Sequence, residues 1–390
     1  MRKSLSIAFL AICVGCLEPY TPPVNINSLT TLVVDGYVST DGTASVKLSR
    51  SVPLSAKDYF PLERGAVVTI GSSSGEIFSL TEGDSAVYAA SGLSTSLEDT
   101  YTLHIKTSKG EEYKSDEIPI VPSPDVDSIY FTVSHSGNEI EIRLDAVDTN
   151  PGATGFYLWD CIETYEYHAP FYSGWKLVDH QPVERTPEEI LYTCWRDVKQ
   201  PSVVSSTNSL ARNVISQQVV AVVPKGSDKL TVRYSVLVRQ RAISAEEYDF
   251  WRDLQNTTEQ TGSIFSVIPG TVVSNVHSLN DEAEYVLGYF RAEDVKERRL
   301  FIDRDDLPES FKVPIDKKGC QPVKTCQVGG GQGFDCVNVE NLSNNALITS
   351  ANTNGAGVIE TFNYVTPNCG DCRYFGGTTI KPSFWIDGSQ

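Results

Sequence analysis

The sequence has no long apolar run and comparatively few basic residues. None of its apolar stretches approaches the ~18 consecutive residues that mark a membrane-spanning helix. Lysine and arginine together number 32, against 50 aspartate and glutamate residues, which gives a formal charge of −18 at pH 7. A surface this acidic repels phosphate backbones, so the composition argues against nucleic acid as a partner.

Motifs that carry catalysis or bind metals are also missing. The five histidines are scattered, without the HExxH spacing of zinc hydrolases, and no GxSxG nucleophile motif occurs. The acidic pairs Glu188-Glu189 and Asp305-Asp306 resemble glycosidase carboxylates only superficially. Glycosidases need two carboxylates that face each other across ~5–9.5 Å, whereas adjacent residues of a strand point to opposite faces. The sequence therefore predicts no catalytic residue, no metal site and no cofactor.

The N-terminus has the features of a secretory leader. Arg2 and Lys3 form a positively charged start, and a short apolar stretch follows from Leu5 to Val14. This stretch is too short to cross a bilayer, but it suits a signal peptide. We expect residues 1–15 to be removed during export.

Cys16 is the predicted site of lipid attachment. The small residue Gly15 precedes it, as in bacterial lipoprotein signals, whereas the bulky Ile12 precedes Cys13. An ordinary cleaved signal with two incidental cysteines is the alternative. Two or three acyl chains on Cys16 would anchor the protein almost permanently, at ~0.8 kcal/mol per buried methylene. Residues 16–29, which contain several prolines, are then an extended tether between the lipid and the folded body.

Composition and residue alternation favour strands over helices. Methionine occurs once, while the chain has 18 tyrosines and many valines and threonines. Residues 30–121 contain short alternating segments separated by Gly- and Ser-rich turns, which predicts a prealbumin- or immunoglobulin-like β-sandwich. Residues 126–312 begin similarly and are predicted to be a fibronectin-III-like β domain with an insertion at 165–220. The expected fold class is mainly β, with tandem β-sandwich domains.

One helix is predicted near residues 244–261. Ser244 and Glu247 have the spacing of a capping box, in which a serine starts a helix and a glutamate follows three positions later. Phe250 and Leu254 are four residues apart and would share one face of the helix. A glycine after this segment is typical of a helix end.

The body of the protein contains an odd number of cysteines, and outside the cytoplasm cysteines normally form disulfides. The candidates for disulfide formation are Cys161, Cys194, Cys320, Cys326, Cys336, Cys369 and Cys372. At least one of them must remain unpaired. Cys161 and Cys194 lie at the two ends of the insertion and could close it. Residues 313–390, rich in Gly, Asn and Cys, are predicted to form an irregular C-terminal lobe held by disulfides.

Cys369 and Cys372 form a CGDC motif, which has three possible explanations. A redox-active CxxC normally starts a helix, but the following RYFGGTTIKP does not have a helical pattern. A zinc site would need two further ligands, which Cys320, Cys326 or Cys336 could supply. The third explanation, which the exported location favours, is that the two cysteines belong to structural disulfides.

The segment WDCIETYEYHAPFYSGW holds more aromatic residues than a core requires. Tyrosine and tryptophan supply large, rigid contact area, so residues 160–195 are predicted to form a contact surface. The candidate contact residues are Trp159, Tyr165, Tyr167, Phe171, Tyr172 and Trp175. The alternative is that these side chains cover the helix that contains Trp251.

Several segments together resemble a known family. YSVLVRQRAISAEEYDFW, GSIFSVIP, VLGYF, CGDC and KPSFW, in this order, are similar to a Bacteroidota lipoprotein family catalogued as domain of unknown function 4249. The resemblance extends from Leu32 to Trp385. It implies an outer-membrane lipoprotein, often encoded beside a TonB-dependent receptor, with no established enzymatic activity and no catalytic residues to transfer.

The expected function is that of a non-enzymatic binding or accessory subunit in the outer membrane. Its predicted partners are the membrane, through the lipid anchor, and a TonB-dependent receptor, while its ligand is not indicated. Glu18 places an acidic residue close to Cys16, which favours the cell surface over the periplasmic side. A surface hydrolase acting on glycans or peptides, and a purely structural envelope protein, are the alternatives.

Overall fold

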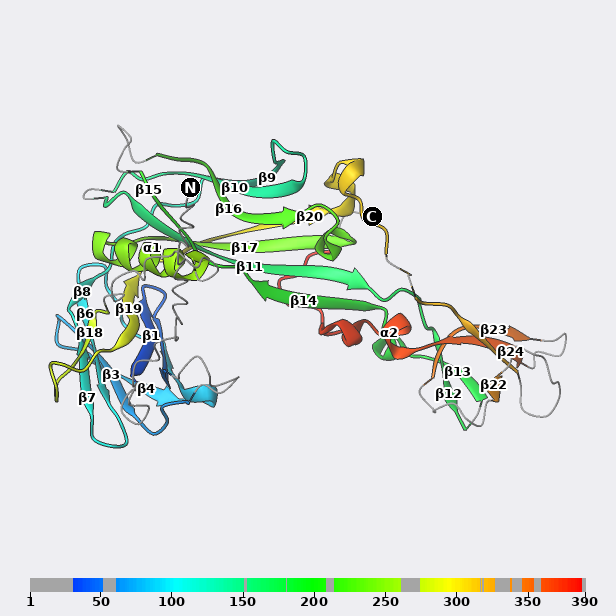
Figure 1. The fold of residues 1–390 in the computed structure, drawn as a ribbon, viewed down its shortest axis with the longest axis horizontal. Coiled ribbons are helices and arrows are strands. Elements are labelled where there is room, and N and C mark those ends of the chain that lie inside the picture. Colours follow the sequence, from blue (N-terminus) through cyan, green and yellow to red (C-terminus); the bar gives the residue numbers. More distant parts are fainter. Residues whose placement is uncertain are drawn as a thin grey trace, which may run out of the picture.

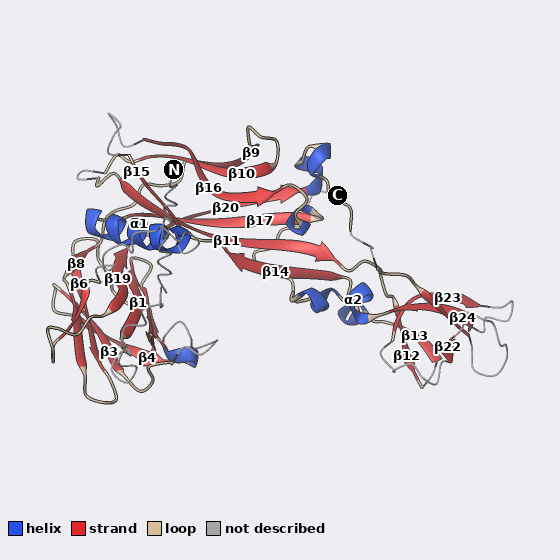
Figure 2. Cartoon of the chain, in the orientation of Figure 1, coloured by secondary structure: helices blue, strands red, loops and turns tan. Residues whose placement is uncertain are grey.

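The computed structural model describes residues 31–51, 61–150, 153–179, 181–207, 214–260, 274–315, 317, 319–326, 337–338, 346–353 and 359–387. The signal peptide, the tether with Cys16, Cys336 and the side chain of Cys326 lie outside the described residues. Within these ranges, no helix combines the length and the apolar character that crossing a membrane requires. The predicted mainly-β fold class is confirmed, as strands dominate the architecture (Figure 2).

The N-terminal unit is built on one sheet of ten strands. Its strands are β1 (Leu32–Ser39), β2 (Thr43–Arg50), β3 (Val67–Ser72), β4 (Ile77–Glu82), β5 (Val87–Ser91), β6 (Thr100–Lys106), β7 (Glu112–Ser115), β8 (Ile118–Pro119), β18 (Val276–Ser278) and β19 (Leu287–Glu293). They follow the order β18-β7-β6-β3-β4-β5-β2-β1-β19, with β8 beside β6. Alternate residues of these strands, such as Val34, Leu48 and Leu103, are fully buried in a common core.

Two strands of this sheet come from a distant part of the sequence. From the sequence, residues 274–293 are expected in the second domain. In the structure, however, β18 pairs with β7, and β19 runs parallel to β1. Phe290 of β19 is fully buried in the N-terminal core. Gly288 lies so close to β1 that a Cβ there would stand 1.9 Å from the carbonyl oxygen of Val34. This close parallel pairing joins the two units.

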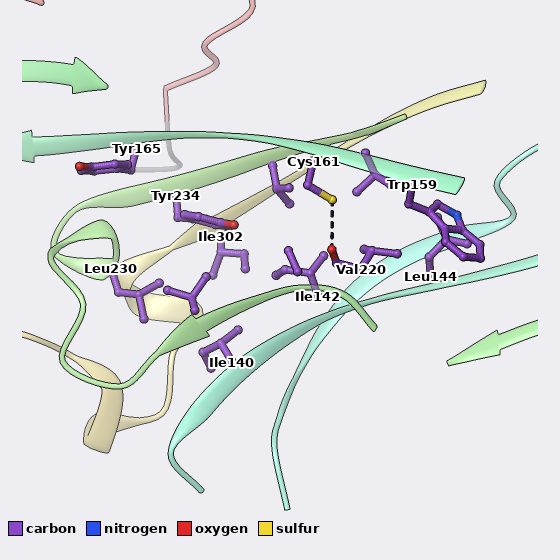
Figure 3. Close-up of a cluster of buried hydrophobic side chains, with 14 of the residues drawn as sticks. Ile140, Ile142, Leu144, Trp159, Cys161, Tyr165, Val220, Leu230, Tyr234 and Ile302 are labelled. Carbon is purple, nitrogen blue, oxygen red and sulfur yellow. Dashed lines mark hydrogen bonds between the residues drawn. The ribbon is translucent and has the colours of Figure 1, made fainter. Parts of the chain in front are cut away.

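The second unit is a sandwich of two sheets. One sheet has the order β16-β10-β9, and the other the order β14-β11-β17-β20, with β15 also beside β11. The bounds are β9 (Ser128–Val133), β10 (Glu139–Val147), β11 (Phe156–His168), β14 (Thr193–Lys199), β15 (Val203–Ser206), β16 (Val214–Pro224), β17 (Arg233–Ala242) and β20 (Lys296–Asp303). Alternating residues of both sheets meet in one core, among them Ile142, Trp159 and Tyr234 (Figure 3).

The long helix α1 (Ala245–Gln260) is confirmed and lies between the two units (Figure 1). The hydroxyl of Ser244 accepts a hydrogen bond from the backbone N–H of Glu247 at 3.1 Å, as the capping pattern predicts. Phe250 packs against Tyr289 of β19, with ring centroids 4.8 Å apart. On the other side, Tyr248 lies 4.7 Å from the ring of Phe156 on β11. The helix therefore contacts both units.

Buried charges reinforce this joint. Arg241 of β17 forms ion pairs with Asp160 of β11 and, at 2.9 Å, with Glu293 of β19. Glu247 of α1 is buried beside them and accepts a hydrogen bond from the indole of Trp251 at 3.1 Å. Burial raises the pKa of Glu247, while nearby arginines oppose this shift. Breaking a buried pair of this kind costs about 3–5 kcal/mol, so the two units are held in a defined orientation.

A small sheet extends away from the sandwich, and we call it the arm (Figure 1). Its strands are β12 (Trp175–Val178), β13 (Gln181–Glu184), β21 (Val323–Cys326), β22 (Val337–Asn338), β23 (Leu347–Thr353) and β24 (Ile359–Val365), in the order β13-β12-β23-β24-β21-β22. Leu177, Ile348 and Phe362 form its core. The arm thus combines part of the predicted insertion with the predicted C-terminal lobe, and the short helix α2 (Pro367–Gly370) follows it.

Candidate functional site

Three of the six predicted contact residues lie in the core rather than on the surface. Trp159, Tyr165 and Tyr167 are at most 8% exposed, and all three belong to the core of the sandwich. They occupy alternate positions of β11 whose side chains point inward. The indole N–H of Trp159 donates a hydrogen bond to Gln240 at 2.9 Å. The prediction of an outer contact face is therefore wrong for these residues, which fill the core of the sandwich instead.

The other three predicted contact residues lie where the arm leaves the sandwich. Trp175 packs on the arm core, and Phe171 packs on a second small cluster around Cys320 and Cys369. Only Tyr172 is well exposed, at 53% of its surface. Its ring stands edge-on to Tyr192 at 5.5 Å. Of the six predicted contact residues, only Tyr172, at the base of the arm, remains well exposed.

Two disulfides fix the same region, and each uses one cysteine of the CGDC motif. Cys372 is bonded to Cys194 at the start of β14, and Cys369 is bonded to Cys320. The motif is therefore the meeting point of two structural bridges, as the third explanation predicts. Together the bridges tie helix α2 to the edge of the sandwich and to the segment that leads into the arm.

Cys161 is a free, fully buried thiol, which corrects its inclusion among the disulfide candidates. Cys194 lies opposite Tyr167 on β11, six positions beyond Cys161, and six strand residues span roughly 20 Å. A disulfide needs Cα atoms within ~7 Å, so these two cysteines cannot bridge. Instead, the Cys161 thiol donates to the carbonyl of Val220 at 3.4 Å (Figure 3), and burial raises its pKa to about 12.

After Cys372 the chain passes from the core side of the sandwich to its outer face, and we call residues 373–387 the C-terminal strap. Thr378 pairs with Trp195 at the edge of β14. Trp385 then packs against Trp195 and Phe301, with ring centroids 6.4 and 5.4 Å away. Its indole N–H donates to Glu166 at 3.2 Å, and Glu166 points outward because its neighbours on β11 point into the core.

The strap exposes several large apolar side chains that are not among the predicted contact residues. Ile380 is 76% exposed and Ile386 is 64% exposed. Tyr374, Phe375 and Phe384 are exposed on the same short segment. Exposed large apolar side chains that lie close together along the chain are candidates for an interaction site. The signal in the sequence was the density of aromatic and isoleucine residues between Cys372 and the C-terminus.

A groove lies at the base of the arm, at the end of the sandwich, and we call it the arm-base groove. It consists of a larger hollow of about 650 Å³ and a smaller one of about 140 Å³. Both are lined by His168, Thr231 and Ile315, so they adjoin each other. The smaller hollow has aromatic walls from Tyr165, Tyr167 and Phe375.

The walls of the groove are held by contacts with one another and with residues outside the groove. The hydroxyl of Tyr167 donates to the carbonyl of Cys372 at 2.8 Å, and His168 stacks on Tyr192 at 4.3 Å. Arg196 donates to the carbonyl of Phe375 at 3.1 Å. Burial raises the pKa of both Tyr165 and Tyr167, so their hydroxyls stay protonated.

A third cavity, of about 480 Å³, lies between β8 and α1. Phe250 and Tyr289 line it, together with several carboxylates. One of them, Asp249, forms an ion pair with Arg252 of the same helix at 2.7 Å. This cavity belongs to the packing of α1 against the N-terminal sheet.

Comparison with known proteins identifies a family. A family model described as "Domain of unknown function (DUF4249)" matches residues 17–299, well over half of the chain. The chain belongs to this family. No protein with a curated function matches the DUF4249 chain.

Among solved structures, a crystal structure of a mutant Salmonella alpha-2-macroglobulin is similar, with a TM-score of 0.17 and 8% identity. That alignment covers 56% of the DUF4249 chain and 14% of the macroglobulin chain, and at this TM-score it carries no argument about function.

The family match begins directly after Cys16 and ends within β20. The N-terminal unit, α1 and most of the sandwich of the DUF4249 chain lie inside it. Helix α2, the strap and three of the four bridged cysteines lie beyond residue 299. The base of the arm is therefore made partly from residues outside the matched range.

The acidic pairs considered for hydrolysis have structural roles in the DUF4249 chain. Glu189 accepts a hydrogen bond from the backbone N–H of Thr186 in a capping box and forms an ion pair with Lys176. Asp306 accepts from the backbone N–H of Asp303 at 2.9 Å in the same way. One carboxylate of each pair thus caps a short 3₁₀ turn.

Proposed function

We propose that this DUF4249 chain is a lipid-anchored outer-membrane lipoprotein with its body at the cell surface. It serves as a non-enzymatic binding or accessory subunit of a TonB-dependent transporter. The leader that ends at Cys16, the acidic Glu18 beside it and the family membership support the location. Two disulfides in the described body are in keeping with an exported protein.

The observation that carries the accessory role is the exposed apolar surface of the C-terminal strap. Ile380 and Ile386 project into solvent, although Trp385 between them is only 5% exposed. The Cys194–Cys372 bridge and the Thr378–Trp195 pairing hold the strap in place. A fixed apolar surface loses little conformational entropy when a partner covers it, which favours binding.

The lipid anchor strengthens the case for a partner in the same membrane. An anchored protein and a membrane-embedded transporter share a thin layer, which raises their effective concentration. A contact surface of modest affinity then suffices for a stable complex. We therefore assign the strap to the contact with the transporter.

Lipid attachment is tested first, by labelling cells with radioactive palmitate. Cys16→Ser is expected to abolish labelling and to release the protein from the membrane. Cys13→Ser, three residues away, is the matched control and is expected to remain labelled. Labelling that survives Cys16→Ser, or that is lost in Cys13→Ser, would contradict the assigned anchor.

The partner is tested by extraction in mild detergent, affinity purification and mass spectrometry. The wild-type chain is expected to recover a TonB-dependent barrel. The double variant Ile380→Asp/Ile386→Asp is expected to lose it, because charged groups are costly to bury at an interface. Ile77→Asp is the control, since Ile77 is 73% exposed but lies on the N-terminal sheet. Recovery of the wild-type chain alone at native expression levels would overturn the accessory role.

A further inference from the structure

The arm-base groove has the dimensions of a ligand site. Its larger hollow of about 650 Å³ falls in the ~300–1,000 Å³ range of ligand pockets. It opens where β11 ends and where the chain turns between η3 (Asp228–Leu230) and β17. The exposed isoleucines of the strap, Ile380 and Ile386, do not line the groove. Ligand binding in the groove can therefore be tested separately from the contact with the transporter.

The charges around the groove balance, although the whole chain is strongly acidic. Histidine aside, the charged residues that line it are three basic and three acidic ones: Arg196, Arg304, Lys317, Asp228, Asp303 and Asp305. A small cation or anion therefore experiences no net electrostatic attraction when it enters the groove. A site lined by charges of one sign would attract an ion of the opposite sign. This balance selects against charged ligands.

The lining also selects against purely apolar ligands. Arg304 and Lys317 stand in the wall of the larger hollow beside Asp303, and an acyl chain would have to desolvate them without offering hydrogen bonds. The smaller hollow has a different character, because Tyr167 and Phe375 meet there nearly at right angles, at 77° and 6.5 Å. The groove thus presents flat aromatic faces beside groups that form hydrogen bonds.

Among the described residues, the groove offers no free sheet edge with which an extended peptide could pair. Such peptides usually bind by adding a strand to an exposed sheet edge. The groove meets strand ends, near His168 of β11 and Asp303 of β20, rather than the side of a strand. The free edge of β14 is itself partly covered, since Thr378 of the strap pairs with Trp195.

We propose that the arm-base groove binds a neutral oligosaccharide. Sugar rings combine flat C–H faces, which pack on aromatic rings, with hydroxyl groups that donate and accept hydrogen bonds. One ring enters the smaller hollow, in the corner formed by Tyr167 and Phe375. Arg196 donates to its hydroxyls and Asp228 accepts from them. Within the described part of the chain, the carboxylate of Asp228 has no hydrogen-bond partner, so it is available to a ligand.

The groove is also rigid enough to recognise a ligand without rearrangement. Cys372, whose carbonyl holds the Tyr167 hydroxyl, is bonded to Cys194 at the edge of the sandwich. Arg304 donates to the carbonyl oxygens of Thr231, at 3.3 Å, and of Val313, which fixes the rim of the larger hollow. Preorganised walls reduce the entropy lost on binding.

The test uses the full chain, extracted in a detergent that has no sugar headgroup. The protein is applied to an array of neutral and anionic soluble oligosaccharides, and each bound sugar is then measured by calorimetry. At least one neutral oligosaccharide is expected to bind. Its Kd is expected to change by less than about twofold between about 0.05 and 0.5 M salt, because no ion pair forms.

Three variants locate the site. Phe375→Ala, Arg196→Gln and Asp228→Asn are each expected to weaken binding about tenfold, which corresponds to the loss of one good contact. Asp84→Asn, at an exposed site on the N-terminal unit, is the control and is expected to bind like the wild type. Circular dichroism confirms that each variant is folded.

Several results would overturn the proposal. These are the absence of any neutral binder on the array, salt-sensitive binding of anionic sugars alone, or binding of an extended tetrapeptide that the three groove variants weaken. Binding of a neutral sugar that none of the groove variants affects would equally refute this site. Sugar binding requires neither the anchor nor the transporter. A failure to bind sugar therefore leaves the pull-down result valid, and a failure to recover the transporter leaves the sugar-binding result valid.

Discussion

The Cys194–Cys372 bridge is expected to contribute more stability than any other covalent link in the described body. It joins residues 178 positions apart, whereas Cys320 and Cys369 are 49 positions apart. In the chain-entropy treatment, closing loops of these lengths destabilises the unfolded chain by about 5 and about 4 kcal/mol respectively. The longer loop also pins the strap and one wall of the groove, so its loss has local consequences too.

The comparison uses paired variants and urea unfolding. Cys194→Ala/Cys372→Ala is expected to lower the free energy of unfolding by about 5 kcal/mol, and Cys320→Ala/Cys369→Ala by about 4 kcal/mol. Cys161→Ala removes a buried thiol that bridges nothing, so we expect a loss of only about 1 kcal/mol. Tryptophan fluorescence follows the transition, because Trp195 and Trp385 pack together beside the longer bridge.

Mapping of peptides without reduction checks the pairing directly. We expect cross-linked peptides that join Cys194 to Cys372 and Cys320 to Cys369, and alkylation of Cys161 only after denaturation. A peptide that joins Cys161 to Cys194 would refute the register on which this reasoning depends. An unfolding free energy that does not change on reduction would refute the stability argument.

Further predictions concern the joint between the units. Burial raises the folded-state pKa of Glu247 above its usual 4.5, so stability is greatest below that value and falls as the pH rises through the folded pKa. In Glu247→Gln, the contribution of this group to the fall in the free energy of unfolding between about pH 4 and 8, measured with urea, should be absent. Glu246→Gln is the control, because the pH dependence of stability that Glu246 contributes has the opposite sign. The pKa of Glu246 is lowered, chiefly by a backbone hydrogen bond, so its contribution to stability is lost as the pH falls. Gly288→Ala should cost more than about 3 kcal/mol, because its Cβ would meet the carbonyl oxygen of Val34 at a positive φ. Gly75→Ala, also at positive φ but in open space, should cost only about 1 kcal/mol in the same measurement. Equal losses in the two glycine variants would contradict the close pairing of β1 with β19.

Local patterns predicted the elements of the fold well where neighbours in sequence decide the structure. The Ser244–Glu247 spacing located the start of α1, since a cap involves only residues of one turn. The second half of the predicted capping box did not form, because the Glu247 carboxylate turns into the buried joint beside Arg241. A contact with another domain overrode the local preference, and no pattern within the helix could have indicated it.

The candidate site was less predictable, because burial depends on what faces each strand. The aromatic density between Trp159 and Trp175 was visible, but alternation along β11 sends Trp159, Tyr165 and Tyr167 into the core. The arm-base groove joins residues from β11, from the turn near Asp228 and from the strap. These segments are far apart in the sequence, so their meeting follows only from sheet order and from the two bridges.

The sequence by itself determined the mainly-β class and the position of the long helix, because each depends on residues close together along the chain. The order of short motifs along the chain indicated the family. Only the tertiary structure decided which cysteines pair, that β19 returns to the N-terminal sheet, and that the insertion and the C-terminal region share one arm. The physical reason is register. A strand's partner and its buried face are set by contacts across the sheet, and these contacts bring together residues that the sequence separates by more than a hundred positions.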